Sequence, residues 1–310
     1  MNLRRLKYFV KIVDIGSLTQ AADVLHIAQP ALSQQIATLE GEFSQQLLVR
    51  TKRGVTPTEA GQVLYRHAQI ILRQFEQAQS DVNNTGESLS GQVSVGLAPG
   101  TAASALALPL LKAVRARHPA ILLYLNENFG TTLSELVMNG RMDMAVLYAG
   151  KNVVHGLSFR PLLKEQLFLV VPPDAFNQPA DIELAKLVDM DLLLPRPYNY
   201  LRKYVDEAFA SQQLTAHVVA EIESASTLSA AVAAGLGATI LPESAARAMA
   251  ASIQANLRRI VSPSIEVPLA LCESDHLPLS EPAQAVKDII LELIDQQAFS
   301  IDHNMAARES

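Results

Sequence analysis

Uncharged polar side chains occupy one side of a predicted helix near the start of the sequence. Pro30, Gln34 and Thr38 lie on that side and Ser33 on its flank, and the candidates for contacts are Gln29, Pro30, Ser33, Gln34, Gln35 and Thr38. At about 100° per residue, an apolar line made of Leu32, Ile36, Leu39 and Phe43 falls on the other side. Amides and hydroxyls both donate and accept hydrogen bonds, and Gln34 can pair with adenine through two of them. The pattern predicts a helix that reads DNA in the major groove, with a helical hairpin of ordinary polar surface as the alternative.

A basic cluster follows this helix. Arg50, Thr51, Lys52 and Arg53 stand between a strand predicted over residues 47–49 and a turn at Gly54, after which residues 55–56 form a return strand. Cationic side chains contact phosphates and supply affinity without sequence information. A solvated basic turn is the common alternative, but the position directly after a helix pair favours contacts with the DNA backbone.

The elements that must position these residues have clear local signals. Ser17 and Gln20 form a capping box at the start of a helix, residues 26–28 form a turn, and Pro30 suits the first turn of the next helix. The sequence therefore predicts a helix-turn-helix over about 18–37, within a winged DNA-binding domain over 1–58.

A long helix is predicted over residues 57–86, capped by Thr56, with Pro57 at its first position. Its apolar residues recur at steps of four and three: Leu64, Ala68, Ile71, Phe75, Ala78 and Val82. This spacing is typical of a coiled-coil seam and predicts dimerisation through the helix. Packing of the seam on the chain's own C-terminal domain is the alternative, and the heptads fit a homodimer and a homotetramer equally well.

Beyond this helix, short apolar runs rich in β-branched residues alternate with helical stretches over residues 92–298. Such alternation predicts an α/β domain with buried sheets. The fold class expected for the whole chain is therefore α+β multidomain: a winged helix-turn-helix, a linker helix and an α/β regulatory domain. Residues 299–310 are polar and without periodicity, so a loose tail is expected there.

Six segments carry a family resemblance: Phe9–Gly16, Ser17–Ala22, Gln29–Ile36, Leu39–Glu40, Leu47–Arg50 and Thr56–Gly61. Together they resemble the N-terminal domain of LysR-type transcriptional regulators. The resemblance implies a C-terminal domain of two Rossmann-like lobes, similar to periplasmic binding proteins. Lobe I would comprise about 92–161 and 266–298, and lobe II about 162–265.

The same resemblance implies double-stranded DNA and RNA polymerase as partners. Residues 1–54 and the run Leu97–Ser104 are most similar to family members that control nitrogen assimilation, which implies a regulator of nitrogen metabolism. A LysR-type regulator of another pathway, responding to a small-molecule effector, is the alternative.

A small-molecule effector would bind between the lobes, where strands end and helices begin. The candidates at such positions are Gly100, Thr101, Thr131, Thr132 and Ser224. Their backbone amides and hydroxyls suit a carboxylate, but each side chain among them is also a good helix N-cap, and capping alone is the alternative.

Composition argues against several other classes of protein. The net charge of −6 is divided unevenly: nine basic against five acidic residues give +4 up to residue 75, which leaves −10 beyond it. Cys272 is the only cysteine and the seven histidines are scattered, so neither a disulfide, a metal site nor a cofactor is expected.

No apolar run approaches the ~18 residues that span a bilayer, and Met1 leads into a charged helix rather than a secretory signal. These features predict a cytoplasmic protein that is not an enzyme. An α/β enzyme with a helical oligomerisation module and a periplasmic solute-binding protein are the rival classes.

Overall fold

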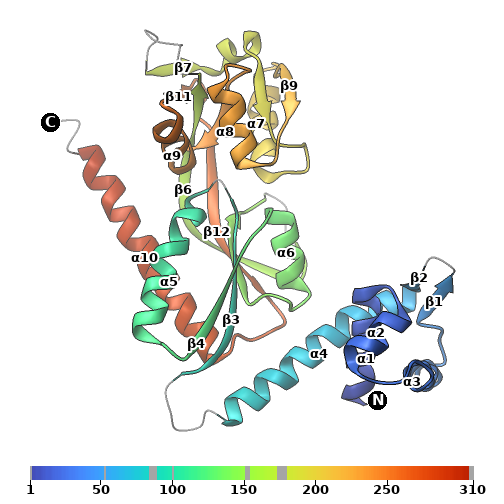
Figure 1. Cartoon of the computed structure of the whole chain (residues 1–310). Helices are drawn as coiled ribbons and strands as arrows, with labels where there is room; N and C mark the ends of the chain where they lie inside the picture. Colours follow the sequence, from blue (N-terminus) through green and yellow to red (C-terminus); the bar gives the residue numbers. More distant parts are fainter. Residues whose placement is uncertain are drawn as a thin grey trace. The chain divides into compact units, whose positions relative to one another are not determined.

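The structure is a computed structural model that describes residues 2–51, 54–83, 89–99, 101–150, 154–172 and 180–306. The chain divides into two compact units (Figure 1). The smaller comprises residues 1–87 with 139–141, and the larger comprises 88–138 and 142–310.

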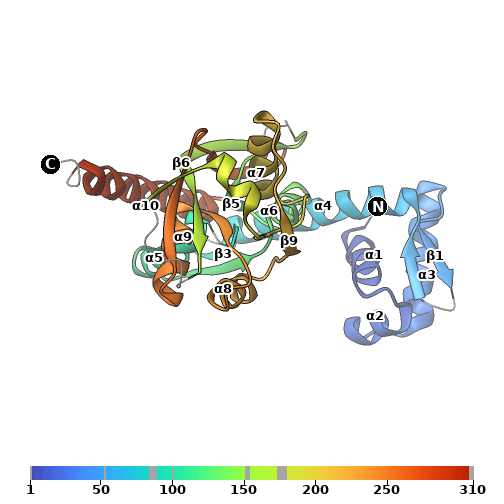
Figure 2. The same cartoon turned by 90° about the horizontal axis from the view of Figure 1, so that it is seen from above.

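The smaller unit is a helical bundle with a two-stranded wing. Its elements are α1 (Leu3–Ile15), α2 (Leu18–Leu25), α3 (Gln29–Phe43), β1 (Leu48–Thr51), β2 (Gly54–Pro57) and α4 (Glu59–Asn83). The first three helices gather around the start of α4, and the antiparallel wing projects beside α3 (Figures 1 and 2). Phe9 of α1, Leu32 and Ile36 of α3 and Ala68 of α4 are fully buried in one core.

Local chemistry sets the helix boundaries of this unit. The Ser17 hydroxyl accepts a hydrogen bond from the Gln20 backbone N–H at 3.4 Å, as the capping box predicts. His26 adopts a left-handed conformation with φ of 54° and ends α2. Pro30 lies in the first turn of α3, where its missing N–H costs no hydrogen bond.

Two expectations for this unit need correction. Thr56 and Pro57 do not start the long helix, because they pair with Val49 and Leu48 in the wing. The helix begins two residues after Pro57, and Thr58 caps it by accepting a hydrogen bond from the Gly61 N–H at 3.0 Å. Phe43 is 41% exposed instead of buried, because it lies in the last turn of α3, outside the buried core of the unit.

The larger unit alternates strands and helices. Its first part contains β3 (Gly91–Leu97), α5 (Ala102–Arg117), β4 (Ile121–Glu127), α6 (Gly130–Met138), β5 (Met144–Tyr148) and β6 (Leu157–Val171). It continues with β7 (Asp181–Glu183), the 3-10 helix Leu184–Asp189, β8 (Leu192–Leu194), α7 (Tyr200–Ser211), β9 (Val218–Glu221) and α8 (Ala225–Ala233). The last elements are β10 (Thr239–Pro242), α9 (Glu243–Ile253), β11 (Asn256–Val261), β12 (Glu266–Ser274) and α10 (Glu281–Ala306).

One eight-stranded sheet runs through this unit in the order β4-β3-β5-β12-β6-β11-β7, and β10 also pairs with β6. Residues 157–161 and 163–166 of β6 pair with β12, with a register shift at Leu162, whereas residues 167–171 pair with β10 and β11. β6 is therefore the strand shared by two lobes, and Figure 1 shows it running from one to the other. Tyr148 at the end of β5 and Glu165 within β6 lie where the lobes meet.

The C-terminal region differs from the expected loose tail. α10 continues through residues 299–306, because an established helix gains one backbone hydrogen bond for each further residue, even where the side chains carry no amphipathic signal. Residues 307–310 lie outside the described residues.

Candidate functional site

The predicted polar residues of α3 differ in how far their side chains are exposed. Gln29, Pro30 and Gln34 are exposed, whereas Ser33, Gln35 and Thr38 are half-buried. The Thr38 hydroxyl donates to the Gln34 backbone carbonyl at 2.9 Å. The exposed amide of Gln34 is thus the most accessible hydrogen-bonding group in the middle of the outer face of α3.

Two predicted residues are held in place by arginines. Arg5 of α1 donates through Nε to the Gln35 Oε1 at 3.0 Å and also forms an ion pair with Glu42. Arg50 of the wing donates through Nη1 to the Ser33 hydroxyl at 2.9 Å. The second bond connects the helix to the wing, so the residues predicted for base contacts and for phosphate contacts form one surface.

The remaining wing candidates are partly described. Thr51 is exposed and its hydroxyl donates to the Gly54 carbonyl at 3.2 Å. Lys52 and Arg53 lie outside the described residues. Gly54 has a φ of +132°, which L side chains rarely adopt, and a Cβ there would meet the Gly16 carbonyl oxygen at 2.6 Å.

Glu40 is a positioning residue that sequence reasoning did not single out. Its Oε1 accepts hydrogen bonds from the backbone N–H of Leu47 at 2.8 Å and of Leu48 at 3.2 Å. These bonds fix the start of the wing against α3. The available signal was the Glu40 carboxylate, which with Glu42 follows an uncharged stretch of the helix.

The predicted seam of α4 has two different halves. Leu64 and Ala68 are buried in the core of the smaller unit, with Ile71 packed against it. Phe75, Ala78 and Val82 are exposed, Phe75 by 43% and Val82 by 71%. Only the second half of the seam therefore offers apolar surface to a second chain.

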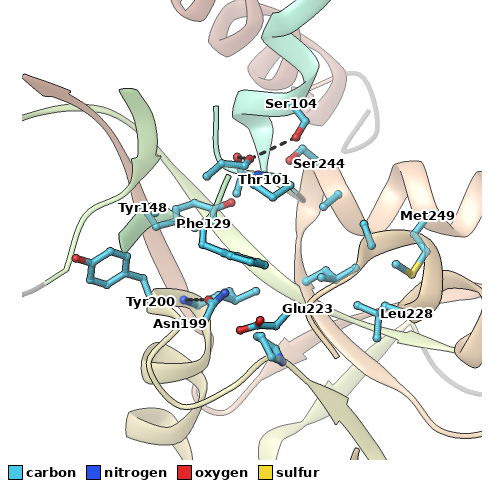
Figure 3. Close-up of a pocket in the computed structure, with 18 of the residues that line it drawn as sticks. Thr101, Ser104, Phe129, Tyr148, Asn199, Tyr200, Glu223, Leu228, Ser244 and Met249 are labelled. Carbon is cyan, nitrogen blue, oxygen red and sulfur yellow. Dashed lines mark hydrogen bonds between the residues drawn. The ribbon is translucent and has the colours of Figure 1, made fainter. Parts of the chain in front are cut away.

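A cleft of about 550 Å³ lies between the lobes of the larger unit. Thr101, Phe129, Thr131 and Tyr148 line it from lobe I (Figure 3). Tyr198, Asn199, Glu223, Leu228, Ser244 and Met249 line it from lobe II. Its size and its apolar walls suit a small organic molecule.

The predicted effector residues fall in different places. Thr101 and Thr131 line the cleft, Thr132 and Ser224 are not among its described lining residues, and Gly100 lies outside the described residues. The Thr101 hydroxyl donates to the Ala98 carbonyl at 2.8 Å and accepts from the Ala103 N–H at 3.0 Å. Ser224 accepts from the Thr227 N–H at 3.3 Å. Both hydroxyls are N-caps, of α5 and of α8.

Behind the cleft wall, a buried carboxylate connects the two lobes. The Tyr148 hydroxyl donates to the Glu165 Oε2 at 2.7 Å, and the Ser244 backbone N–H donates to the Oε1 at 3.1 Å. Burial, reinforced by the neighbouring Glu165, raises the pKa of Tyr148 well above its ordinary value. Sequence reasoning missed Glu165 because it lies in a polar stretch of β6.

Comparison with known proteins follows this division of the chain. Residues 3–62 match the bacterial regulatory helix-turn-helix protein domain of the lysR family, and residues 86–295 match the LysR substrate binding domain. The chain belongs to the LysR family. As a member of that family it is a DNA-binding transcription regulator, as α3 and its wing indicate.

Individual relatives agree with the family assignment. The LysR-family chain is 57% identical to the nitrogen assimilation regulatory protein nac of Klebsiella aerogenes, covering 96% of each chain. It is 56% identical to the protein of the same name from Escherichia coli K12, covering 95% of each. A full-length OxyR variant from Pseudomonas aeruginosa has the same fold, with a TM-score of 0.71 at 24% identity over 95% of this chain and 94% of that one. Across the described ranges of this LysR-family chain, no helix is both long and apolar enough to cross a membrane.

Proposed function

We propose that this regulator controls nitrogen-assimilation genes in the cytoplasm, acting with RNA polymerase as a homodimer or homotetramer and catalysing no reaction. The relatives that are 57% and 56% identical both carry nitrogen assimilation in their names. Their similarity spans the DNA-binding and the regulatory parts of the chain alike, which supports a shared function.

The observation that carries the DNA-binding proposal is the single surface formed by α3 and the wing. Gln34 is exposed at its centre, and the Ser33–Arg50 hydrogen bond sets the wing at a fixed place beside it. In this proposal Gln29, Gln34 and Ser33 contact base edges, whereas Arg50 and its neighbours contact phosphates.

Pairing of two chains follows from the exposed half of the seam. Phe75, Ala78 and Val82 lie beyond the part of α4 that the chain's own core covers. We assign dimerisation to these residues. Leu64 and Ala68 instead pack α4 against the core of the smaller unit. A dimer presents two α3 helices to two half-sites, which multiplies affinity and specificity.

In the same proposal, the cleft between the lobes receives a small-molecule effector. Genome-wide mapping of the DNA fragments bound by the purified full-length protein, with and without nitrogen metabolites, tests both parts. We expect a dyad sequence enriched near nitrogen-assimilation genes. Enrichment near unrelated genes would reject nitrogen control, and absence of any preferred sequence would reject specific binding.

A further inference from the structure

Glu223 gives the cleft an unusual charge. Among the described residues that line the cleft, it is the one acidic residue, and these residues include no lysine, arginine or histidine. Figure 3 shows its carboxylate facing the same hollow as the Phe129 ring. The cleft therefore carries a negative charge of its own.

One oxygen of this carboxylate lacks a partner. Glu223 Oε1 is buried and no group in the described part of the chain donates a hydrogen bond to it. The Glu223 carboxylate acts on the Tyr198 hydroxyl and raises the pKa of Tyr198. Because this oxygen is covered by the protein, a ligand in the cleft would meet the carboxylate from the side that lines the cleft.

The surroundings favour a positively charged donor over a neutral one. Glu165 lies behind the Tyr148 and Ser244 wall and adds a second carboxylate close to the cleft. Arg196 acts on the Tyr198 hydroxyl, but it is exposed and does not line the cleft. The N-terminus of α5 favours anions in general, yet here Thr101 already caps it.

The walls suit the apolar part of such a ligand. Phe129, from the connection before α6, faces the hollow together with Leu228 of α8 and Met249 of α9 (Figure 3). An aromatic ring next to a carboxylate attracts an organic cation, because the negative ring face and the carboxylate act on the same charge. The cleft volume of about 550 Å³ accommodates a small molecule.

We propose that the cleft binds a small organic cation, whose ammonium group pairs with the Glu223 carboxylate and whose apolar body lies against Phe129. The ligand class rests on the proposed function, in which this cleft is the effector site. It differs from the carboxylate that the capping residues suggest, because the hydroxyls of Thr101 and Ser224 are engaged by their own helices.

Three probes of equal chain length test the charge preference: n-pentylammonium chloride, n-pentanol and sodium pentanoate. Titration of the full-length protein, followed by ligand-observed NMR at constant ionic strength, should show n-pentylammonium binding about tenfold more tightly than n-pentanol. Pentanoate should bind least. A preference for pentanoate, or equal binding of the ammonium and the alcohol, would overturn the proposal without any variant.

Glu223→Gln should remove the preference for the ammonium while n-pentanol still binds. Glu221→Gln is the matched control, because Glu221 is exposed, lies outside the cleft lining and faces Arg202 at 3.7 Å. A preference that survives in Glu223→Gln would reject the role of this carboxylate. DNA binding of wild type and both variants is measured in parallel, so that loss of regulator function is distinguished from an incorrect ligand class.

Discussion

At the scale of single residues, Gln34 carries the proposed sequence preference. Its side chain is exposed on α3 and its backbone carbonyl accepts from Thr38, so the amide is presented from a regular helix. Removal of one bidentate contact affects one base position, whereas removal of a phosphate contact affects all sequences.

We expect Gln34→Ala to lose about 1 to 3 kcal/mol of binding free energy at one base position. Competition binding with a set of operators, each carrying one single-base change, measures this loss of binding free energy. Gln45→Ala, which changes an exposed glutamine beyond the end of α3, should leave the profile intact. Equal weakening on all sequences would contradict base contact by Gln34.

Tyr65 predicts a pH dependence. Burial, together with the hydrogen bond to Asp14, raises its pKa from 10.0 to about 12. Because the folded pKa lies above the unfolded one, the stabilisation is complete below pH 10 and is lost as the pH rises towards 12.

Tyr65→Phe should therefore abolish one late tyrosinate transition in ultraviolet titration. It should also flatten the fall in unfolding free energy between pH 10 and about 12. Tyr8→Phe in α1 is the control in the same unit. An unchanged slope in Tyr65→Phe would show that the raised pKa of Tyr65 does not contribute to the fall in stability.

The roles of some residues can be predicted from the sequence, whereas the roles of others cannot. Ser17 and Pro30 act on neighbours within a few positions, so their capping roles are predictable from spacing. Glu165 and Glu223 could not be predicted in this way. Their partners are far away in the sequence, Ser244 for the first and Tyr198 for the second, and only the folded chain brings them together.

At the scale of elements, α4 serves two purposes along its length. Its first turns belong to the core of the smaller unit, and its later turns expose apolar side chains. The heptad spacing predicted an apolar seam but could not tell which partner covers each part, because a stripe is equally apolar against the chain's own α1 and against a second chain.

Phe75→Glu should shift the protein towards monomer, because it places a charge in the exposed half of the seam. Val63→Glu is a close control: the two side chains are 43% and 44% exposed. At about 100° per residue, Phe75 falls within about 20° of Leu64, whereas Val63 lies about 100° away. Light scattering after size-exclusion chromatography measures the mass. If both variants had the same mass in solution, dimerisation through the exposed half of the seam would be rejected.

Strands show where prediction from sequence fails. The apolar runs at 93–97 and 144–147 were identifiable as buried strands, and they match β3 and β5. The first half of β6 was not, because Arg160, Lys164 and Glu165 interrupt any apolar run. That half lies beside β12, where the exposed Lys164 faces Glu266 at 3.8 Å and the buried Glu165 accepts a hydrogen bond from Tyr148.

At the scale of the whole molecule, the Tyr148–Glu165–Ser244 contacts hold β5, β6 and α9 together at the cleft. Tyr148→Phe should lower the unfolding free energy by about 1 to 3 kcal/mol, since it withdraws a donor from a buried carboxylate. Urea denaturation of the full-length protein measures this.

Tyr124→Phe, at an exposed position of β4, is the control and should change the unfolding free energy by less than about 0.5 kcal/mol. If Tyr148→Phe were as stable as the control, water would replace the phenol hydroxyl as donor to Glu165 without a loss of unfolding free energy.

The order of strands in the large sheet has a consequence for biosynthesis. β12 lies between β5 and β6, yet it consists of residues 266–274, near the end of the chain. A ribosome therefore releases β3, β4 and β5 long before it supplies the strand that closes their sheet. The sheet of lobe I therefore stays incomplete until lobe II has been translated. A nascent chain that stops before residue 266 would leave the edge of β5 unpaired.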